Sequence, residues 1–302
     1  MMADRPVIPV SVVGGFLGAG KTTLLNRLLQ ENEGRRLGVI VNDFGDINID
    51  EKLIVTRDED MVSLANGCIC CSIGNDFLRA LISLVTRADP PEQIIIEASG
   101  VADPMRIAAI ARADKALRLQ GIFVLVDATQ YQSQAADPLL ADTVHAQVGA
   151  ADLLLLTKTD IASTVQTREV AELLERERPG VLRVETTTPD VPVSLLFDFS
   201  ASPRMPLTGP HDPHALFWTG SIASDKACDI DQLTAVLEDC VGLLRCKGFV
   251  RSTDGGGRLV QWTAGRLELS SLEVVPDETA LVYIGVGPKP AGVERSLGDC
   301  FE

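Results

Sequence analysis

The sequence is short of positive charge, since 27 Lys and Arg stand against 42 Asp and Glu and give a formal net charge of −15. Nucleic acid and anionic lipid both attract basic surfaces, so this balance argues against nucleic-acid binding and against docking on a membrane. No apolar run approaches the roughly 20 residues that a membrane helix needs. The N-terminus lacks a basic segment followed by a long apolar stretch, so no signal peptide is predicted and a cytoplasmic location is expected.

The sequence also lacks the even, widely spaced cysteines of a disulfide framework. Three of its seven cysteines lie within four residues: Cys68, Cys70 and Cys71. The other four are widely spaced: Cys228, Cys240, Cys246 and Cys300. In a reducing compartment such a tight cluster indicates metal binding or redox activity. The length of 302 residues is too great for one compact core and predicts two domains.

Short apolar runs alternate with helix-like segments through the first two-thirds of the chain. Strands are expected at 7–13, 37–41, 94–96, 122–126 and 153–156, and helices at 21–31, 77–87 and 165–178. Continuous apolar strands alternating with helices are typical of a parallel sheet that is covered on both faces. The sequence therefore predicts an α/β domain over 1–200, with a doubly wound, mainly parallel sheet.

This alternation ends near residue 200. Residues 201–214 hold four prolines and a glycine, and this composition predicts a linker. Beyond it, strands are expected at 216–221, 243–251, 259–263, 266–269 and 281–286, with one helix at 229–241. Asp229 stands where an N-terminal cap is useful, and Asp231 where a first-turn acid is useful. Residues 215–302 are thus predicted to form a smaller α+β domain.

The segment Gly15–Thr22 fits the pattern G-x-x-x-x-G-K-[ST], between an expected strand and an expected helix. Glycines let backbone N–H groups turn inward around phosphate oxygens, and the helix N-terminus adds the positive end of its dipole. Lys21 is expected to reach the β- and γ-phosphates, and the Thr22 hydroxyl to bind magnesium. The residues assigned here to the nucleotide are Gly15, Gly18, Ala19, Gly20, Lys21, Thr22 and Thr23.

The segment Thr157-Lys158-Thr159-Asp160 follows the strand expected at 153–156. Asp160 offers a carboxylate that accepts both N–H donors of guanine, and the stem of Lys158 can lie along the base. The alternative is a solvated turn that caps the next helix. Coming after a phosphate-binding loop, the segment favours guanine recognition.

Glu97 ends the apolar strand Ile94–Ile96, and Gly100 follows three residues later. An acid at this place completes the magnesium shell or orients the attacking water, and Gly100 would let backbone approach the γ-phosphate. The alternative is a strand-end acid that is hydrogen-bonded to a loop. Asp43 and Asp46 lie on a glycine-containing loop after the second strand, where they could reach a cation or merely cap local backbone. We assign Lys21, Glu97 and Asp46 to catalysis and Asp43 to the metal ion.

The segment Asn66–Cys71 places thiols at positions i, i+2 and i+3, where Cys68, Cys70 and Cys71 can converge on a cation such as zinc. A fourth ligand must come from an acid, a histidine or water. Buried small hydrophobes, a disulfide and a redox sensor are the alternatives.

Together these motifs resemble the CobW-type P-loop GTPases. The resemblance rests on residues 14–25, 42–50, 66–71, 97–104, 126–128 and 157–160, and on 243–248 and 283–285 in the second domain. It implies a slow GTPase that delivers a transition metal, most often zinc but also cobalt, to a client metalloprotein. It places the cargo metal at Cys68, Cys70 and Cys71.

Thr157 stands where Asn is commonest in GTPases, and the loss of one side-chain amide predicts a looser loop there. This chain departs from the family pattern in three further respects. Asp43 and Asp46 stand where glutamates are usual, Val41 stands where some members carry an acid, and no histidine-rich stretch is present. These differences leave the choice of metal open between zinc and another divalent transition metal.

The leading interpretation is a GTP-hydrolysing metallochaperone with GTP, Mg²⁺ and Zn²⁺ as its ligands. The alternative is a zinc-binding regulatory or scaffold module whose conformation the nucleotide sets. The oligomeric state stays open, a homo-oligomer included.

Overall fold

The computed structural model describes residues 7–32, 34–42, 61–64, 75–187, 196–199, 217–263, 265–272, 274–276 and 279–301. These residues fall into two compact units, one before and one after residue 214. The predicted linker lies outside the described residues, so the domain boundaries drawn at it stay a prediction. No helix in the described part of the chain is long and apolar enough to cross a membrane.

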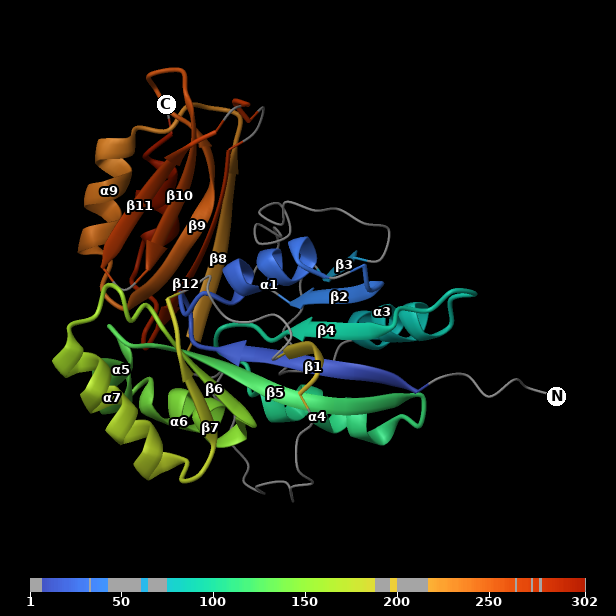
Figure 1. Ribbon diagram of the computed structural model, residues 1–302. Coiled ribbons are helices and arrows are strands. Elements are labelled where there is room, and N and C mark those ends of the chain that lie inside the picture. Colours follow the sequence, from blue (N-terminus) through green and yellow to red (C-terminus); the bar gives the residue numbers. More distant parts are fainter. Residues whose placement is uncertain are drawn as a thin grey trace. The chain divides into compact units, whose positions relative to one another are not determined.

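The first unit is built on a sheet of seven parallel strands in the order β3-β2-β4-β1-β5-β6-β7 (Figure 1). The strands are β1 (Ile8–Gly15), β2 (Leu37–Asn42), β3 (Met61–Leu64), β4 (Gln93–Glu97), β5 (Leu117–Asp127), β6 (Leu153–Thr157) and β7 (Leu182–Glu185). The helices are α1 (Lys21–Gln30), α3 (Asn75–Val85), α4 (Pro104–Ala113), α5 (Tyr131–Ala136), α6 (Ala141–Ala150) and α7 (Thr164–Glu177). The predicted doubly wound α/β fold is confirmed.

The strand order reverses at β1, because β4 and β5 are its two neighbours while the chain passes from β1 to the more distant β2. In open parallel sheets, ligands bind at the carboxyl ends of the strands at such a reversal. The segment that leaves β1 at this point is the glycine-rich loop of residues 15–20. The topology therefore puts that loop where a ligand site is expected.

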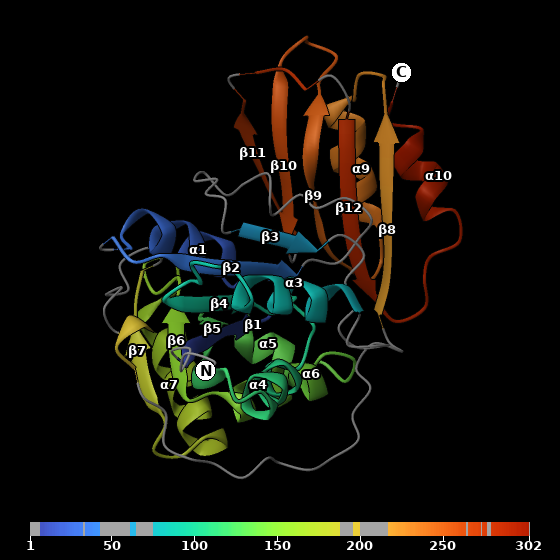
Figure 2. The same cartoon turned by 90° about the vertical axis from the view of Figure 1, so that its right-hand side faces the viewer.

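Apolar side chains hold helices against both faces of this sheet. Figure 2 shows α1 on one face and α4 and α6 on the other. Four leucines of α1 are buried against the sheet together with Leu196 and Phe197, from the short described segment 196–199: Leu24, Leu25, Leu28 and Leu29. Burying one such side chain stabilises a fold by about 1.5–3 kcal/mol, so this layer fixes α1 and the loop that precedes it.

A buried polar network crosses the same sheet. The Gln93 amide donates to Gln120 Oε1 at 2.7 Å and to Ser11 Oγ at 3.0 Å. The Gln120 amide in turn donates to the backbone carbonyl of Phe197. Buried amides are stable only when they are paired, so this network ties segment 196–199 to the middle of the sheet.

The second unit is an antiparallel sheet of five strands in the order β11-β10-β9-β12-β8, with two helices. Its elements are β8 (Phe217–Ser224), α9 (Ile230–Asp239), β9 (Leu243–Arg251), β10 (Gly257–Thr263), β11 (Arg266–Ser271), β12 (Thr279–Val286) and α10 (Val293–Gly298). Side chains of α9 and α10 share one buried cluster with the sheet, among them Leu233, Leu237, Val293 and Leu297. The predicted α+β architecture is confirmed.

The caps follow the expected chemistry. Asp229 caps α9, since its Oδ1 accepts from the N–H groups of Asp231 and Gln232 at 3.0 Å each. Ser163 and Gln166 form a reciprocal capping box at the start of α7.

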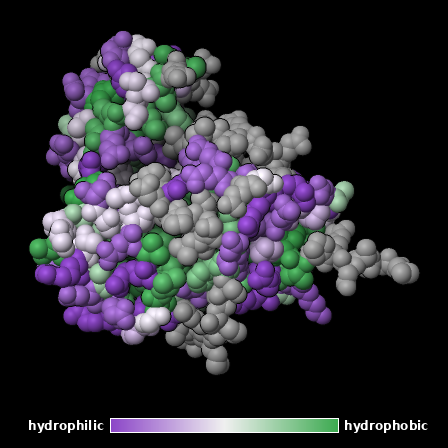
Figure 3. All heavy atoms as spheres, viewed as in Figure 1, coloured by the Kyte–Doolittle hydropathy of each residue, from purple (hydrophilic) through white to green (hydrophobic). Residues whose placement is uncertain are grey.

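Hydrophilic side chains cover much of the face seen in Figure 3, and apolar side chains lie between them in small groups. Several large apolar side chains are exposed, among them Ile82, Val241 and Val274. Scattered apolar side chains are normal on soluble protein surfaces and by themselves indicate no binding site.

Candidate functional site

The loop between β1 and α1 has the backbone of a phosphate cradle. Gly15, Gly18 and Gly20 have φ angles of 132°, 78° and 101°, which side chains with a Cβ rarely adopt. Ala19 N donates to Phe16 O at 3.2 Å, which closes a tight turn. The helix α1 starts at Lys21 directly after Gly20, so its first N–H groups and the positive end of its dipole face the loop.

Lys21 lies inside this loop. Its side chain is 5% exposed, and Nζ donates to the backbone carbonyls of Gly15 at 2.8 Å and of Phe16 at 3.1 Å. Thr22 is half-buried at the start of the helix, and Thr23 is exposed. The loop therefore brings one ammonium group, one hydroxyl and several N–H groups to one place.

The second predicted segment meets this loop directly. Thr157, at the end of β6, is fully buried, and its Oγ1 lies 3.0 Å from Ala19 O and 3.2 Å from Val126 O. The hydroxyl has one proton, which goes to either of these carbonyls. The contact joins the phosphate loop to the Thr157–Asp160 segment although 138 residues separate them in the chain.

Lys158 and Asp160 follow at the same sheet edge. Lys158 has a φ of 59°, the one positive φ among the described non-glycine residues, and its side chain is 30% exposed. Its Nζ pairs with Asp127 Oδ2 at 2.7 Å. Asp160 is exposed, so its carboxylate is available to a ligand.

Asp127 is a site residue that sequence reasoning did not assign. It ends β5, is 6% exposed, and its Oδ1 accepts from Thr129 N at 2.8 Å and from Thr129 Oγ1 at 2.6 Å. The two carboxylate oxygens thus hold a turn and the Lys158 ammonium together. Its place in the chain could have identified it, because Asp127 comes directly after the apolar run of residues 122–126, as Glu97 comes directly after Ile94–Ile96.

Glu97 and Gly100 lie on the other side of β1. Glu97 is 4% exposed at the end of β4 and stands in register with Val13 of β1 and Val41 of β2. A Cβ built on Gly100 would overlap the Leu17 side chain and lie 3.0 Å from Leu17 N. The loop after Glu97 therefore packs against the phosphate loop, and only glycine fits at that contact.

The remaining predicted site residues, Asp43, Asp46, Cys68, Cys70 and Cys71, lie outside the described residues. Within the described ranges, no three His, Cys, Asp or Glu side chains are gathered closely enough to hold a metal ion. The assignment of the cargo metal therefore stays a prediction.

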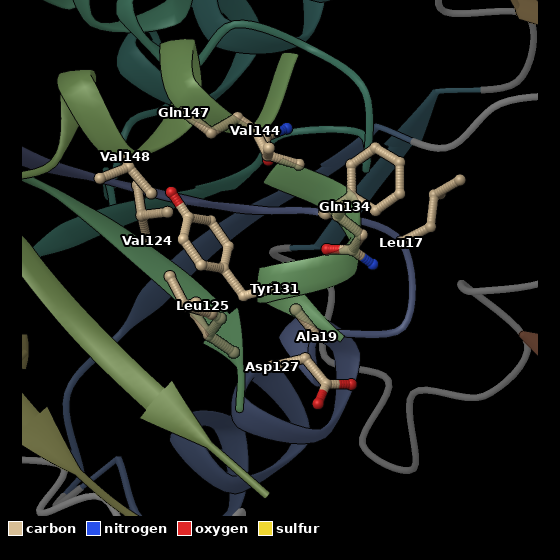
Figure 4. Close-up of a pocket in the computed structure, with 12 residues that line it drawn as sticks. Leu17, Ala19, Val124, Leu125, Asp127, Tyr131, Gln134, Val144, Gln147 and Val148 are labelled. Atoms are coloured by element: carbon tan, nitrogen blue, oxygen red, sulfur yellow. The ribbon is translucent and has the colours of Figure 1, made fainter. Parts of the chain in front are cut away.

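A small hollow of about 10 Å³ lies between the phosphate loop, β5, α5 and α6 (Figure 4). It has room for about one water molecule. Its lining includes Leu17 from the loop, Tyr131 and Gln134 from α5, and Gln147 from α6. It is too small for a nucleotide.

Three polar side chains join the helices behind this hollow. Tyr131 OH donates to Glu177 Oε2, and the same oxygen lies 3.1 Å from His145 Nδ1. Burial, with Glu177 as a further cause, raises the pKa of Tyr131 well above its usual range, so the phenol stays a donor. His145 is 43% exposed in its side chain, which matches a residue that packs only in part.

Family comparisons match both units. The CobW/HypB/UreG nucleotide-binding domain matches residues 9–184, and the cobalamin synthesis protein cobW C-terminal domain matches residues 217–301. Zinc chaperone YjiA of Escherichia coli (strain K12) is 34% identical over 264 residues, which cover 80% of this chain and 81% of that protein. Zinc chaperone CobW of Sinorhizobium sp is 30% identical over 293 residues, which cover 82% of each chain.

Two further matches extend this set. Zinc-regulated GTPase metalloprotein activator 1 of Dictyostelium discoideum is 31% identical over 297 residues, which cover 80% of this chain and 62% of that protein. The crystal structure of Zn(II)-bound YjiA GTPase from E. coli covers 98% of this chain at 25% identity, with a TM-score of 0.47. The two domain matches and the relatives of at least 30% identity, together with a glycine-rich loop at the reversal point of a parallel sheet, show that this chain belongs to the CobW family of P-loop nucleotide-binding proteins.

Proposed function

We propose that this protein is a GTPase metallochaperone, which binds and hydrolyses GTP and passes a transition metal to a client metalloprotein. The main support for GTP binding is the contact between the Thr157 hydroxyl and Ala19 O, because this contact joins the phosphate loop to the guanine-type segment. Asp160 accepts the two N–H donors of guanine, a pair that adenine does not present at that edge. Lys158, held by Asp127, lies along the base.

The residues of the site divide the work of hydrolysis. The N–H groups of Gly15, Gly18, Ala19, Gly20 and Thr23 surround the phosphates. The Lys21 ammonium exchanges its bonds to loop carbonyls for bonds to the β- and γ-phosphates. Because phosphoryl transfer depends on positioning and charge stabilisation, this one cation contributes strongly to the rate. Glu97, with Asp46, orients the attacking water, and Gly100 lets backbone come close to the γ-phosphate.

The oxygen donors of the site suit magnesium. Thr22 offers a hydroxyl at the start of α1, and Glu97 offers a buried carboxylate in register with β1, the strand that leads into the loop. Hard cations prefer such oxygen ligands, and Asp43 is a further candidate. When bound there, magnesium would supply positive charge that offsets the charge of the phosphates during transfer.

The cargo metal is assigned to Cys68, Cys70 and Cys71. Metal binding needs thiolates, and burial raises the pKa of Cys228 and Cys246 to about 12 and of Cys300 to about 11. These thiols of the second unit therefore stay protonated near neutral pH, and within the described ranges they belong to no group of three metal-binding side chains, so they are poor candidates for the cargo site. Zinc is the favoured cargo because relatives are zinc chaperones by name, with cobalt as the second choice.

The competing function is a zinc-binding regulatory or scaffold module with little turnover. The two differ in hydrolysis and in coupling between nucleotide and metal. A metal carrier captures its cargo in one nucleotide state and releases it in the other, and such coupling is reciprocal. The cytoplasm is the compartment expected for either function.

Two measurements on the whole chain test this proposal. The first is steady-state GTP turnover, for which Lys21→Ala is expected to abolish hydrolysis because the cation at the phosphates is lost. The second is a competition titration with a chromophoric chelator, in which zinc affinity is expected to differ at least about fivefold between a GTP analogue and GDP. Replacing Cys70 and Cys71 by Ser should remove that difference while GTP binding persists.

The outcomes separate the two functions. Turnover without any difference in zinc affinity leaves a GTPase but no switched carrier. Zinc binding without turnover supports the regulatory module. Unchanged turnover in Lys21→Ala, with the variant folded, overturns the assignment of the phosphate loop.

A further inference from the structure

Gln147 is a buried side chain for which the proposed mechanism has so far no use. It lies on α6, is 2% exposed, and lines the small hollow behind the phosphate loop (Figure 4). Its Nε2 donates to two backbone carbonyls, Gly100 O and Ala102 O, at 3.1 Å each. Both N–H groups of the Gln147 amide therefore donate to the loop that follows Glu97.

Hydrogen bonds within residues 99–105 also hold that loop. Ala102 N donates to Ser99 O at 3.0 Å, which makes a turn, and Asp103 caps α4 by accepting from Met105 N at 2.9 Å. Gly100 packs against Leu17 so closely that no Cβ fits there. The loop is thus clamped between the phosphate loop on one side and the Gln147 amide on the other.

Gln147 is itself fixed by neighbouring helices. Two residues earlier on α6, His145 lies 3.1 Å from Glu177 on α7, and Tyr131 on α5 donates to the same carboxylate oxygen. Contacts at three helices therefore set where α6 stands. Because α6 is fixed in this way, the Gln147 amide restricts the positions that the two carbonyl groups it contacts can take.

We propose that Gln147 is a positioning residue for hydrolysis, which sets the Glu97–Gly100 loop at the distance from the phosphate loop that the γ-phosphate requires. This inference rests on the proposed GTPase function. Groups that stabilise a transition state work best when they are preorganised, and a misplacement of about 1 Å can cost on the order of 100-fold in rate. GDP has no γ-phosphate, so we expect its binding to depend much less on this loop than the binding of GTP does.

The test compares Gln147→Met and Gln147→Glu with the wild-type chain. Met keeps the length of the side chain and removes both donors, while Glu keeps the shape and sets a carboxylate against two carbonyls. Gln134→Met is the matched control, because Gln134 lines the same hollow from α5. The measurements are kcat and KM for GTP, and the affinities for GDP and for a non-hydrolysable GTP analogue.

In both Gln147 variants we expect kcat to fall about tenfold or more, within the range for misplaced catalytic groups. Affinity for the GTP analogue should fall relative to affinity for GDP, which should stay within about twofold of wild type. Gln134→Met should keep wild-type values. This pattern separates positioning from folding, since a loss of fold would weaken GDP binding as well.

Either of two results overturns the inference: an unchanged kcat in a folded Gln147→Met chain, or equal losses for GDP and the GTP analogue. If the wild-type chain hydrolyses no GTP, the proposed function fails. The ratio of the two affinities in wild type and variants still decides on Gln147, because it does not depend on turnover.

Discussion

Thr157 shows how much one hydroxyl can contribute to the site. It occupies the place where most GTPases carry Asn, so the sequence predicts a looser loop there. In the structure its Oγ1 reaches Ala19 O, in the middle of the phosphate loop, at 3.0 Å. A short hydroxyl therefore makes the link between the two nucleotide-binding segments without an amide.

Replacing this hydroxyl should weaken both fold and binding. Thr157→Val keeps the shape but leaves a buried carbonyl without its donor, so we expect the free energy of unfolding to fall by about 1–2 kcal/mol. Urea unfolding measures this loss, and nucleotide titration should show weaker GTP binding. Thr159→Val, two residues along at a half-buried position, is the control. Equal losses in the two variants would contradict a specific role for the Thr157 contact.

Asp160 should carry the preference for guanine. Its carboxylate is exposed, and we expect it to accept two hydrogen bonds from the base. Losing charge-assisted bonds of this kind costs about 1.5–3 kcal/mol. Asp160→Ala should therefore bring GTP affinity down towards that for ATP. Competition between the two nucleotides measures the ratio. Equal affinities already in the wild type would sink the assignment.

The role of Asp127 could not be predicted from sequence motifs. The sequence identifies Lys158 from its neighbours, but its partner lies 31 positions earlier and becomes visible only when β5 and β6 pair, with Asp127 opposite Thr157. Gln147 is hidden for the same reason. The Gln147 amide donates to backbone carbonyls of a loop that is distant in the sequence. Every residue has such a carbonyl, so the amino-acid sequence does not indicate which one a side chain contacts.

At the scale of elements, strongly apolar or well-capped segments are the predictable ones. The buried strands β1, β4 and β6 and the helices α1, α7 and α9 were predicted within a few residues. The elements that were missed are β3, α4, α5, α6, β7 and α10. β7 is a half-exposed strand at a sheet edge, and α5 and α10 have six residues each, so tertiary packing rather than a local pattern decides them.

The strand β12 in the second unit depends on the absence of a side chain at Gly285. A Cβ there would run into the indole ring of Trp218, which crosses from β8 and packs edge-on against Tyr283. Gly285→Ala should therefore destabilise the protein by about 1–3 kcal/mol, the usual cost of overpacking. Differential scanning calorimetry gives the measurement.

Gly298→Ala is the matched control in the same unit. A Cβ on Gly298, at the end of α10, would meet nothing within 4 Å, so this change should be neutral or slightly stabilising. If both variants lose thermal stability equally, the destabilisation of Gly285→Ala does not come from the contact with Trp218.

The whole molecule should lose stability in alkali. The pKa of Cys246 is raised from 9.0 to about 12, first by burial, and that of Tyr283 from 10.0 to about 12 by burial and then Glu294. Between their ordinary and raised values the unfolded chain has lost these protons and the folded chain has kept them. The free energy of unfolding therefore falls as pH rises from about 9 towards about 12.

Urea midpoints at several pH values from about 8 to about 11 measure this slope. Cys246→Val should make the slope less steep without abolishing it, because that variant loses one titrating thiol while Tyr283 still titrates. A wild-type stability that stays constant above pH about 9.5 would contradict the expectation.

The polar network that crosses the sheet bears on where the nucleotide-binding half can be cut from the rest of the chain. The family match ends at residue 184, yet Leu196 and Phe197 belong to the core and the Gln120 amide donates to Phe197 O. Cutting the chain at residue 184 would uncover four α1 leucines in part and leave a buried amide without its acceptor. A truncation that keeps Phe199, whose ring packs edge-on against Phe123, retains both features and is the boundary to choose for studying the nucleotide-binding half alone.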